Sequence, residues 1–269
     1  MILYSNAKIN IGLYITEKRS DGYHNLETIF YPVKLYDVIE LNSSEELSLD
    51  TYGIEIPEQG ENLCIKAYNL LKADFPKIKP YKINLLKNIP IGAGLGGGSS
   101  NASYVLKALN ELNSLSLSDL ELSKYAARLG ADCPFFIVNK PVFATGIGND
   151  FSDVKIDLSS YYIIIIKPDI HISTAEAYAN ITPSTPQVDL RNAIQLPIQE
   201  WKYNIVNDFE IGIFDKYPQI AAIKHALYEK GAIYASMSGS GSSVFGIFNK
   251  ELNIDDLSNY GKIYYPVSI

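Results

Sequence analysis

Cysteine is scarce in this chain of 269 residues, and its scarcity limits both disulfide and metal chemistry. The two cysteines are Cys64 and Cys133, and neither a CxxC motif nor a Cys/His cluster has the spacing of a zinc site. The N-terminus lacks the charged segment and the apolar segment of a secretory signal peptide. These absences predict reduced cysteines and a cytoplasmic protein.

Long apolar runs and excess positive charge are also missing. The longest apolar run, residues 161–166, is far shorter than the roughly 20 residues that cross a bilayer, and it predicts a buried strand instead. Because 30 acidic side chains outnumber 23 basic ones, the net charge is −7, opposite in sign to what a nucleic acid attracts. We therefore expect neither a membrane nor a nucleic acid as partner, and an anionic ligand would depend on individual lysines.

The remaining composition is that of a folded globular protein, with 47% apolar and 20% charged residues. At about 150 residues per domain, the length fits two domains or one large one. The N-terminal residues 2–15 alternate apolar and polar side chains, which predicts a strand with one buried face and with Lys8 and Asn10 together on the other. A turn dipeptide, Asp21-Gly22, then leads into a second strand-like segment over residues 26–41.

Local signals predict helices and strands along the rest of the chain. Asn62 is expected to cap a helix that stops before Pro76, and Ser118 with Glu121 forms a possible capping box. The C-terminal part follows the order strand, helices, strand, strand, helix and strand, at residues 161–167, 201–209, 220–228, 232–237, 243–248, 254–257 and 262–267. This order resembles a split βαβ arrangement with helices on one face of an antiparallel sheet, which is an α+β fold.

The segment 90–100 carries the strongest functional signal, because five glycines occupy the seven positions from Gly92 to Gly98. Bare glycine backbone brings successive N–H groups within reach of an anion, and the positive end of a following helix attracts phosphate. The hydroxyls of Ser99 and Ser100 could donate to phosphate or hold a magnesium ion. The density of glycine between a predicted strand, residues 81–87, and a predicted helix favours phosphate binding over a flexible turn without ligand.

The same glycines match the GxGxxG pattern through Gly92, Gly94 and Gly97, but their surroundings exclude a dinucleotide-binding fold. The preceding strand contains Lys82 and Lys87, where a central parallel strand would be apolar, and no acidic residue ends a second strand about 20 residues later. P-loop NTPases are excluded because no GK[ST] follows the glycines, and the VAIK, HRD and DFG motifs of protein kinases are absent.

Other candidate residues are ambiguous when each is taken alone. Asp132 stands before a proline and two phenylalanines, where its carboxylate could act as a base or as a helix N-cap, and the two roles are compatible. Lys8 alone cannot be told from an ordinary lysine on a half-exposed strand. Tyr23 and His24 are either a surface pair or a platform for a flat ring. The glycine-serine loop at residues 238–242 is either a plain hairpin connection or a second phosphate loop.

Three segments together resemble the GHMP kinases, the family of galactokinase, homoserine kinase, mevalonate kinase and phosphomevalonate kinase. They are the lysine-bearing strand at residues 7–10, the glycine-serine loop at 90–101 and the second glycine loop at 237–241. The segments RSDGYHNL, residues 19–26, and GADCPFF, residues 130–136, are most similar to the members that phosphorylate a cytidine-diphosphate-linked methylerythritol in the non-mevalonate isoprenoid pathway. Mevalonate and homoserine kinases lack the Asp-Gly-Tyr-His piece, and the resemblance covers nearly the whole chain.

The resemblance implies a two-domain fold and an ATP- and Mg²⁺-dependent transfer of a phosphoryl group to the tertiary 2-hydroxyl of that substrate. Residues 1–158 are expected to resemble the second domain of ribosomal protein S5 and to carry the ATP loop. Residues 159–269 are expected to form a ferredoxin-like domain, with the active site between the two domains.

The resemblance also implies roles for individual residues. Asp132 is expected to be the base and Lys8 its cationic neighbour. The expected substrate contacts are Asn10, Tyr23 and His24 (the last two on the cytidine), a less closely matched aromatic wall at Tyr178, and Ser240 and Gly241. ATP is expected to contact Lys87, Pro90, Gly92, Gly94, Leu95, Gly96, Gly97, Gly98, Ser99 and Ser100, with Ser100 also the candidate magnesium ligand.

Two alternatives remain open on the sequence alone. A related GHMP kinase that acts on homoserine or mevalonate would keep the ATP loop but would ignore cytidine. A nucleotide-binding protein without catalytic activity would bind ATP and release no ADP.

Overall fold

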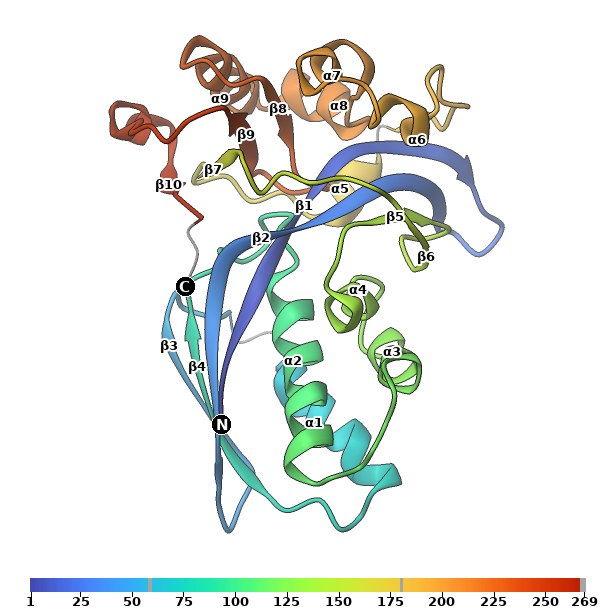
Figure 1. Cartoon of the computed structure of the whole chain (residues 1–269), viewed down its shortest axis with the longest axis vertical. Coiled ribbons are helices and arrows are strands. Elements are labelled where there is room, and N and C mark those ends of the chain that lie inside the picture. The colour runs from blue at the N-terminus through green and yellow to red at the C-terminus, as the bar shows by residue number, and fades with distance from the viewer. Residues whose placement is uncertain (58–59, 180, 267–269) are drawn as a thin grey trace. The chain divides into compact units, whose positions relative to one another are not determined.

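The computed structural model describes residues 1–57, 60–179 and 181–266 (Figure 1). These residues form two compact units, and each unit is assembled from several segments of the chain. The first unit comprises Met1–Ala7, Leu35–Ile91 and Gly96–Lys140, and the second comprises Lys8–Lys34, Gly92–Leu95 and the chain from Pro141 onward. The strands β1 (Ile2–Lys18) and β2 (His24–Ser43) contribute residues to both units. A division of the chain at residue 158 stays a prediction.

In the first unit, helices pack on one face of a sheet (Figure 1). Strand β3 (Ser48–Gly53) runs parallel to β4 (Tyr81–Lys87), and helix α1 (Leu63–Asp74) lies between them in the chain. The C-terminal part of β2 pairs antiparallel with β4. Helix α2 (Gly97–Leu112) packs against α1, and α3 (Asp119–Ala127) and α4 (Cys133–Val138) pack beside it.

Two helix starts in this unit confirm the capping signals of the sequence. The side chain of Asn62 accepts a hydrogen bond from the Cys64 backbone N–H at 2.9 Å, at the start of α1. Ser118 and Glu121 form the reciprocal capping box of α3. The strand β4 has the predicted bounds, and its side chains alternate between the core and the surface, so that Lys87 points to the buried side.

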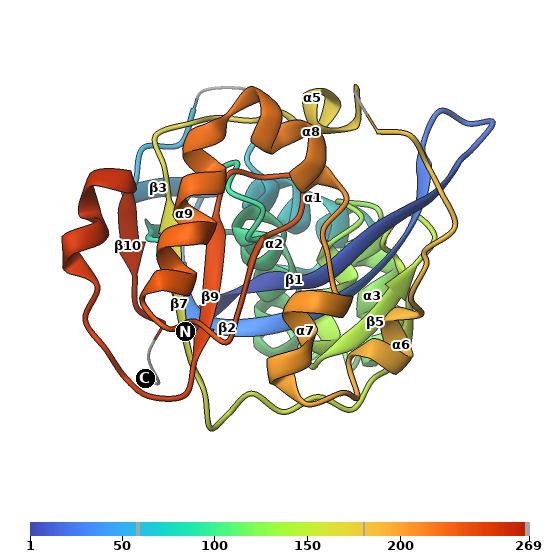
Figure 2. The ribbon, with the colours of Figure 1, turned by 90° about the horizontal axis from the view of Figure 1, so that it is seen from above.

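In the second unit, four strands form an antiparallel sheet in the order β10-β7-β9-β8. Their bounds are β7 (Tyr162–Lys167), β8 (Tyr234–Met237), β9 (Val244–Phe248) and β10 (Lys262–Tyr264). Helices α8 (Phe209–Lys216) and α9 (Pro218–Glu229) pack together, and α9 covers β8 and β9 (Figure 2). The chain order of strands and helices confirms the predicted ferredoxin-like α+β arrangement.

Shorter elements complete the second unit. The N-terminal part of β2 pairs with β5 (Val142–Thr145), which pairs with β6 (Asp150–Asp153). The remaining helices are α5 (Thr174–Ala179), α6 (Leu190–Ala193), α7 (Ile198–Asn204) and the 3₁₀ helix η1 (Asp255–Tyr260). Among the described residues, no helix has both the length and the apolar composition needed to cross a bilayer.

Several predicted elements have different bounds in the structure. The helix predicted across residues 201–209 is two helices, α7 and α8, because the chain between them pairs with β1: the Leu13 N–H donates to Val206 O and the Asp208 N–H to Leu13 O, both at 2.9 Å. The predicted short helix near Ile254 is the 3₁₀ helix η1. The last strand ends at Tyr264, and Val267, its predicted end, lies outside the described residues.

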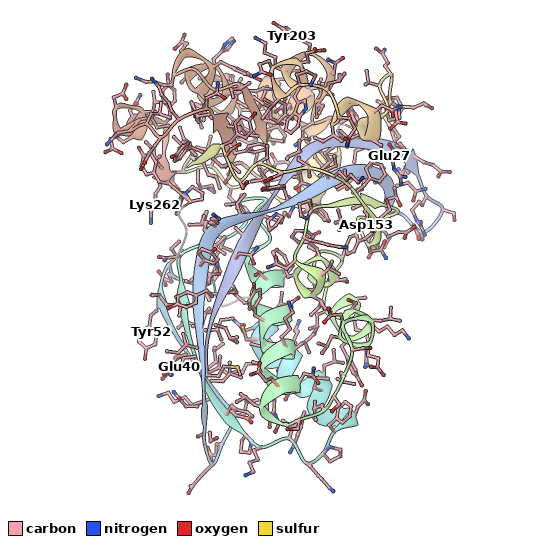
Figure 3. All side chains as sticks on the ribbon, in the orientation of Figure 1. Glu27, Glu40, Tyr52, Asp153, Tyr203 and Lys262 are labelled. Carbon is pink, nitrogen blue, oxygen red and sulfur yellow. The ribbon has the colours of Figure 1, made fainter. Side chains whose placement is uncertain are left out.

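Some of the abundant tyrosines are exposed at the surface, and others are buried in the core. Tyr52 on β3 and Tyr203 on α7 project from the ribbon in Figure 3, with 54% and 75% of their surface exposed. Tyr234 on β8 is buried and packs edge-on against Trp201, with ring centroids 5.8 Å apart. Tyrosine content alone is therefore no guide to which aromatic residues could meet a ligand.

Candidate active site

The glycines of the first loop have two different structural roles. Gly92, Gly94 and Gly96 have φ angles of +63°, +76° and +69°, which place them in the left-handed region that only glycine enters readily. Gly96 is the N-cap of α2, so Gly97 and Gly98 already belong to the helix. The loop predicted over residues 90–100 is therefore shorter than expected, because its last four residues form the first turn of α2.

The start of α2 suits an anion. Its N-cap has no side chain, its first turn carries no acidic residue, and its first backbone N–H groups have no partner within the helix. The first helical hydrogen bond runs from the Ser100 N–H to Gly96 O at 2.9 Å. Bare N–H groups at the positive end of a 16-residue helix make a binding place for phosphate.

Ser100 is the predicted magnesium ligand, and its surroundings in the structure show whether it could bind the ion. Its side chain is buried, and its hydroxyl has no hydrogen-bond partner among the described residues. A buried hydroxyl without a partner is costly unless a ligand completes it. Among the described residues, no three His, Cys, Asp or Glu side chains form a metal cluster. A single buried hydroxyl beside a phosphate site fits Mg²⁺, which is commonly held by few protein groups together with phosphate oxygens and water.

The second glycine loop touches the tip of the first within the second unit. The Ser238 hydroxyl donates to Gly94 O at 2.9 Å and accepts from the Asn10 N–H at 3.3 Å. A Cβ atom on Gly94 would lie 1.8 Å from Ser238 O, and a Cβ on Gly241 would lie 2.2 Å from Gly94 N. Both positions therefore require glycine, because the two backbones approach too closely for any side chain. Ser240 lies half-buried at the turn of this loop.

Lys8 and Asn10 lie against the same place, and both are buried rather than half-exposed as predicted. They retain 4% and 2% of their surface, because residues on both faces of β1 are covered. The Lys8 N–H donates to Leu95 O at 3.0 Å, and its Nζ donates to Asn10 Oδ1 at 2.6 Å. Asn10 Nδ2 donates to Thr28 Oγ1 at 3.0 Å, and Lys8 Nζ lies 4.8 Å from the centre of the Phe30 ring. The sequence alternation could not reveal what covers the second face.

Asn207 holds the second glycine loop and was missed by the sequence analysis. Its Nδ2 donates to Met237 O and Gly239 O, each at 2.9 Å, and its Oδ1 accepts from the Phe209 N–H at 3.0 Å. Glu210, on the same helix start, accepts from the Met237 N–H at 2.8 Å. The polar pair at residues 207 and 208 interrupts two apolar helical segments, and this interruption was the sequence signal that could have identified Asn207.

The residues expected at the cytidine are only partly brought together. His24 stacks on Tyr178, with ring centroids 4.8 Å apart and ring planes inclined by 24°. Tyr23 is 61% exposed, and its N–H donates to Asp21 Oδ1 at 3.1 Å. Arg19 holds Asp21 with an ion pair of 2.8 Å and keeps the pKa of that carboxyl low. An ordered turn thus presents the Tyr23 ring to solvent beside a preformed aromatic pair.

Asp132 occupies the predicted N-cap position of α4, but its side chain makes no cap hydrogen bond. The structure therefore contradicts the N-cap reading of this carboxylate, one of the two roles considered: the backbone at Asp132 is helical, whereas an N-cap residue typically has an extended backbone. The next residue is anchored to α2: the Ser103 hydroxyl donates to Cys133 O at 2.7 Å and to Ser99 O at 2.9 Å. Burial raises the pKa of the Cys133 thiol to about 11, so this cysteine stays protonated.

Lys87 and Pro90, predicted to contact ATP, are both buried. The Lys87 Nζ donates to Asp37 Oδ2 and to Ile89 O, each at 2.6 Å. Burial lowers the pKa of Lys87, and the charge of Asp37 opposes that shift. A nucleotide contact of the Lys87 side chain stays a prediction.

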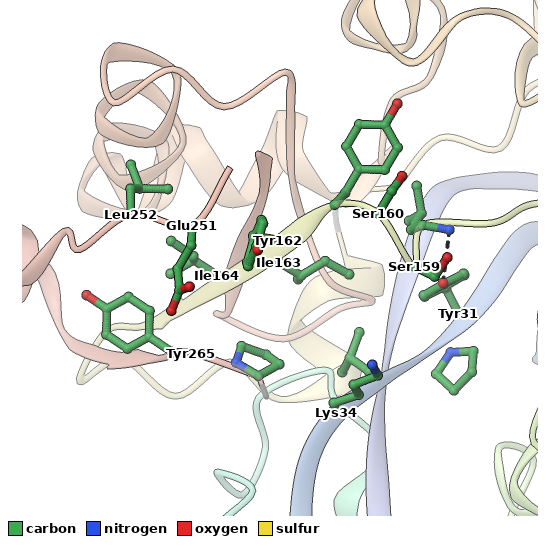
Figure 4. Close-up of a pocket in the computed structure, with 15 residues that line it drawn as sticks. Tyr31, Lys34, Ser159, Ser160, Tyr162, Ile163, Ile164, Glu251, Leu252 and Tyr265 are labelled. Atoms are coloured by element: carbon green, nitrogen blue, oxygen red, sulfur yellow. Dashed lines mark hydrogen bonds between the residues drawn. The ribbon is translucent and has the colours of Figure 1, made fainter. Parts of the chain in front are cut away.

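A separate cavity of about 490 Å³ opens in the second unit between β2, β7 and the chain around Tyr265 (Figure 4). Lys34 reaches it from β2 and Glu251 from the segment after β9, and the Leu158 N–H donates to the Tyr31 hydroxyl at 3.1 Å at its edge. The predicted site residues do not line this cavity.

Two family models match the chain. The model of the GHMP kinases N terminal domain matches residues 62–140, and that of the GHMP kinases C terminal domain matches residues 197–266. The chain is 55% identical to a 4-diphosphocytidyl-2-C-methyl-D-erythritol kinase of Bacteroides thetaiotaomicron, over 93% of each chain. It is 49% identical to a protein of the same name from Parabacteroides distasonis, over 98% of this chain and 97% of that one.

Solved structures agree with these relatives. A crystal structure of 4-(cytidine 5'-diphospho)-2C-methyl-D-erythritol kinase matches 98% of this chain and 97% of its own, with a TM-score of 0.83 and 28% identity. A crystal structure of mevalonate kinase matches with a TM-score of 0.70 and 16% identity over 98% of each chain, which shows a shared fold. The resemblance predicted from the glycine loops and the Asp-Gly-Tyr-His segment is thus confirmed. The chain belongs to the 4-diphosphocytidyl-2-C-methyl-D-erythritol kinase family of the GHMP kinases.

Proposed function

We propose that this protein transfers the γ-phosphoryl group of ATP to the 2-hydroxyl of 4-diphosphocytidyl-2-C-methyl-D-erythritol, which yields the 2-phosphate and ADP in non-mevalonate isoprenoid precursor synthesis. The observation that carries the proposal is the bare N-terminus of α2, with the buried Ser100 hydroxyl in its first turn. Cys64 and Cys133 are buried free thiols, which supports a cytoplasmic location for the reaction.

The reaction needs a base, a phosphate cradle and cationic groups near the transferred phosphoryl group. The Asp132 carboxylate accepts the proton of the 2-hydroxyl, whose oxygen then bonds to the γ-phosphorus while the bond to the β–γ bridging oxygen breaks and ADP leaves. The backbone of residues 94–99 binds the phosphates, and Lys8 offsets negative charge that develops during transfer. Bound Mg²⁺ would be held through Ser100 and phosphate oxygens, and it would neutralise phosphate charge.

A coupled ADP-release assay against three alcohols tests the proposal. We expect turnover with the cytidyl substrate and background rates with mevalonate and homoserine. Turnover with either of those two alcohols alone would establish a different kinase of the family. Binding of ATP without ADP release from any of the three would establish a nucleotide-binding protein without catalytic activity.

The cytidine half of the proposal predicts a specific effect of His24→Ala. Loss of a stacking or hydrogen-bonding contact in a partly buried site is worth about 1–3 kcal/mol, or roughly 5- to 150-fold in affinity. We therefore expect CMP to become a weaker competitive inhibitor and the KM for the cytidyl substrate to rise, with a smaller change in the KM for ATP. His225→Ala, at an exposed position on α9, is the control. Equal inhibition constants for wild type and His24→Ala would remove His24 from the cytidine site.

A further inference from the structure

A buried carboxylate outside the predicted catalytic set links three segments of the first unit. Asp37, on β2, has no exposed surface. Its Oδ1 accepts hydrogen bonds from the backbone N–H groups of Asn88 and Ile89, at 2.7 and 2.8 Å. Its Oδ2 accepts from Lys87 Nζ at 2.6 Å and from Asn101 Nδ2 at 2.9 Å. One side chain thereby joins the end of β4, the approach to the glycine loop and the first part of α2.

The partners of Asp37 are themselves fixed. The Lys87 Nζ also donates to Ile89 O at 2.6 Å, and Asn101 Nδ2 also donates to Ser5 Oγ at 2.8 Å. The start of α2 rests directly on this cluster, because a Cβ on Gly97 would lie 2.9 Å from both Lys87 Nζ and Ile89 Cγ2. Glycine at position 97 is thus explained by close approach to the cluster, since its φ is not positive.

A second ion pair on the same strand provides a comparison with the buried Lys87–Asp37 pair. Lys82, also on β4, pairs with Asp50 at 2.7 Å, and both of those side chains are nearly half exposed. An exposed pair of this kind contributes little to stability. Burying Lys87 and Asp37 costs desolvation energy, which is acceptable only when the remaining donors and acceptors are satisfied. Both Asp37 oxygens accept hydrogen bonds and two of the three Lys87 N–H groups donate them, and the pair gives the three segments a fixed orientation.

We propose that Asp37 is a positioning residue for ATP, which holds the N-terminus of α2 against the end of β4 and the segment Asn88–Ile89, and that Lys87 acts through Asp37 and makes no side-chain contact of its own with the nucleotide. The inference rests on the proposed function, because it assumes that the first loop binds ATP. It replaces the predicted direct role of Lys87, whose ammonium group is already committed to two acceptors.

Calorimetric titration of the full chain with MgATP tests the first part. Asp37→Asn keeps the size of the side chain and removes the charge, and we expect it to raise the Kd about tenfold, the ratio that corresponds to ~1.4 kcal/mol. Asp50→Asn is the matched control and should change the Kd less than about twofold, as expected for an exposed pair. A lowered Tm with an unchanged Kd in the folded protein would mean that Asp37 is merely structural and would overturn the proposal.

A second variant covers the case in which Asp37→Asn does not fold. Asn101→Ala removes the hydrogen bonds from α2 to Asp37 and Ser5 but leaves the Lys87–Asp37 pair intact. We expect it to weaken MgATP binding severalfold, since a net hydrogen bond contributes about 0.5–1.5 kcal/mol. An unchanged Kd for Asn101→Ala would also overturn the positioning role.

A double-mutant cycle with Lys87→Gln tests the second part. If Lys87 acts through Asp37, then Lys87→Gln and Asp37→Asn each weaken binding, and the double variant is no weaker than the poorer single variant. If Lys87 contacts ATP itself, then its substitution weakens binding by the same factor in the Asp37→Asn background, and that result contradicts the proposal. Wild-type protein that fails to bind MgATP would instead refute the proposed function, so the two failures are distinguishable.

Discussion

The two glycine loops are alike in composition and different in structure. The first has three glycines with positive φ and leads into α2, whose opening N–H groups are bare. The second joins the antiparallel strands β8 and β9 and has one glycine with positive φ, Gly239. The first is anchored by a buried ion pair, Lys87 with Asp37, and the second by the Asn207 amide. Glycine and serine content indicates bare backbone, and the element that follows decides what this backbone can bind.

This difference suggests a division of labour. A helix N-terminus adds a dipole that favours negative charge, so the first loop suits the phosphates of ATP. The second loop starts no helix, and its backbone lies against Gly94 with room for no side chain. We therefore propose that the second loop, with Ser240 and Gly241, contacts the alcohol substrate.

Neither loop carries out the transfer in this account, so the largest effect belongs to Asp132. Asp132→Asn should lower kcat about 10²-fold or more, because a positioned base contributes roughly 10²–10⁴-fold. The affinity for ATP should stay nearly unchanged, since the substitution is almost isosteric. Asp119→Asn, in the first turn of α3, is the control and should leave kcat at the wild-type value. Wild-type turnover of Asp132→Asn would remove Asp132 from catalysis.

Gly94→Ala should damage both loops at once, because Gly94 is where they meet. The added Cβ would collide with the Ser238 carbonyl oxygen and would also have to adopt a φ of +76°. We expect the KM values for both substrates to rise about tenfold or more and the Tm to fall, since backbone strain alone costs about 1–3 kcal/mol. Gly231→Ala, at a φ of +91° and with no described atom within 4 Å of the added Cβ, measures the strain without the collision. Equal effects of the two variants would show that the contact between the loops is unimportant.

Asn207→Ala should affect mainly the second loop. It leaves the carbonyl groups of Met237 and Gly239 without their donor, and a buried group left unsatisfied costs about 1–3 kcal/mol of stability. The KM for the alcohol should rise severalfold, and the KM for ATP should change less. Asn204→Ala removes a comparable hydrogen bond from an exposed amide and should be close to neutral. Thermal unfolding and steady-state kinetics of both variants measure the difference.

The smallest expected effect separates two serines that are alike in the structure. Ser100 and Ser243 are both buried, and neither hydroxyl has a hydrogen-bond partner among the described residues. Ser100 lies in the first turn of α2, and Ser243 follows the second loop. Ser100→Ala should raise the Mg²⁺ concentration for half-maximal activity by a few fold, and Ser243→Ala should not. If both variants share the wild-type Mg²⁺ dependence, Ser100 is not a magnesium ligand.

Much of the fold was predictable because its signals are local. The caps at Asn62 and Ser118, the bounds of β4 and the strand order of the C-terminal part all depend on residues close in the chain. The start of α2 was not predictable in the same way. Gly97 and Gly98 are poor helix formers, and they are helical because tertiary contacts outweigh their low propensity.

The buried polar residues that hold the site in place, Asp37 and Asn207, could not be predicted from the sequence for a related reason. Asp37 meets Asn101 across 64 positions of the chain, and Asn207 meets Gly239 across 32. A buried polar residue that acts through such long-range hydrogen bonds has no local pattern. The motif residues themselves were predictable, whereas the burial of Lys8 depended on what covers the second face of β1.

The most direct test of the division between the loops is a crossed measurement of two KM values in Gly98→Ala and Asn207→Ala. Gly98 is exposed in the first turn of α2, and among the described residues a Cβ there would meet only Leu63 Cδ1, at 3.7 Å, so we expect its substitution to leave the fold undisturbed. We predict that Gly98→Ala raises the KM for ATP and leaves that for the alcohol unchanged, whereas Asn207→Ala mainly raises the KM for the alcohol. An unchanged KM for ATP in Gly98→Ala, or the same pattern in both variants, would contradict the account.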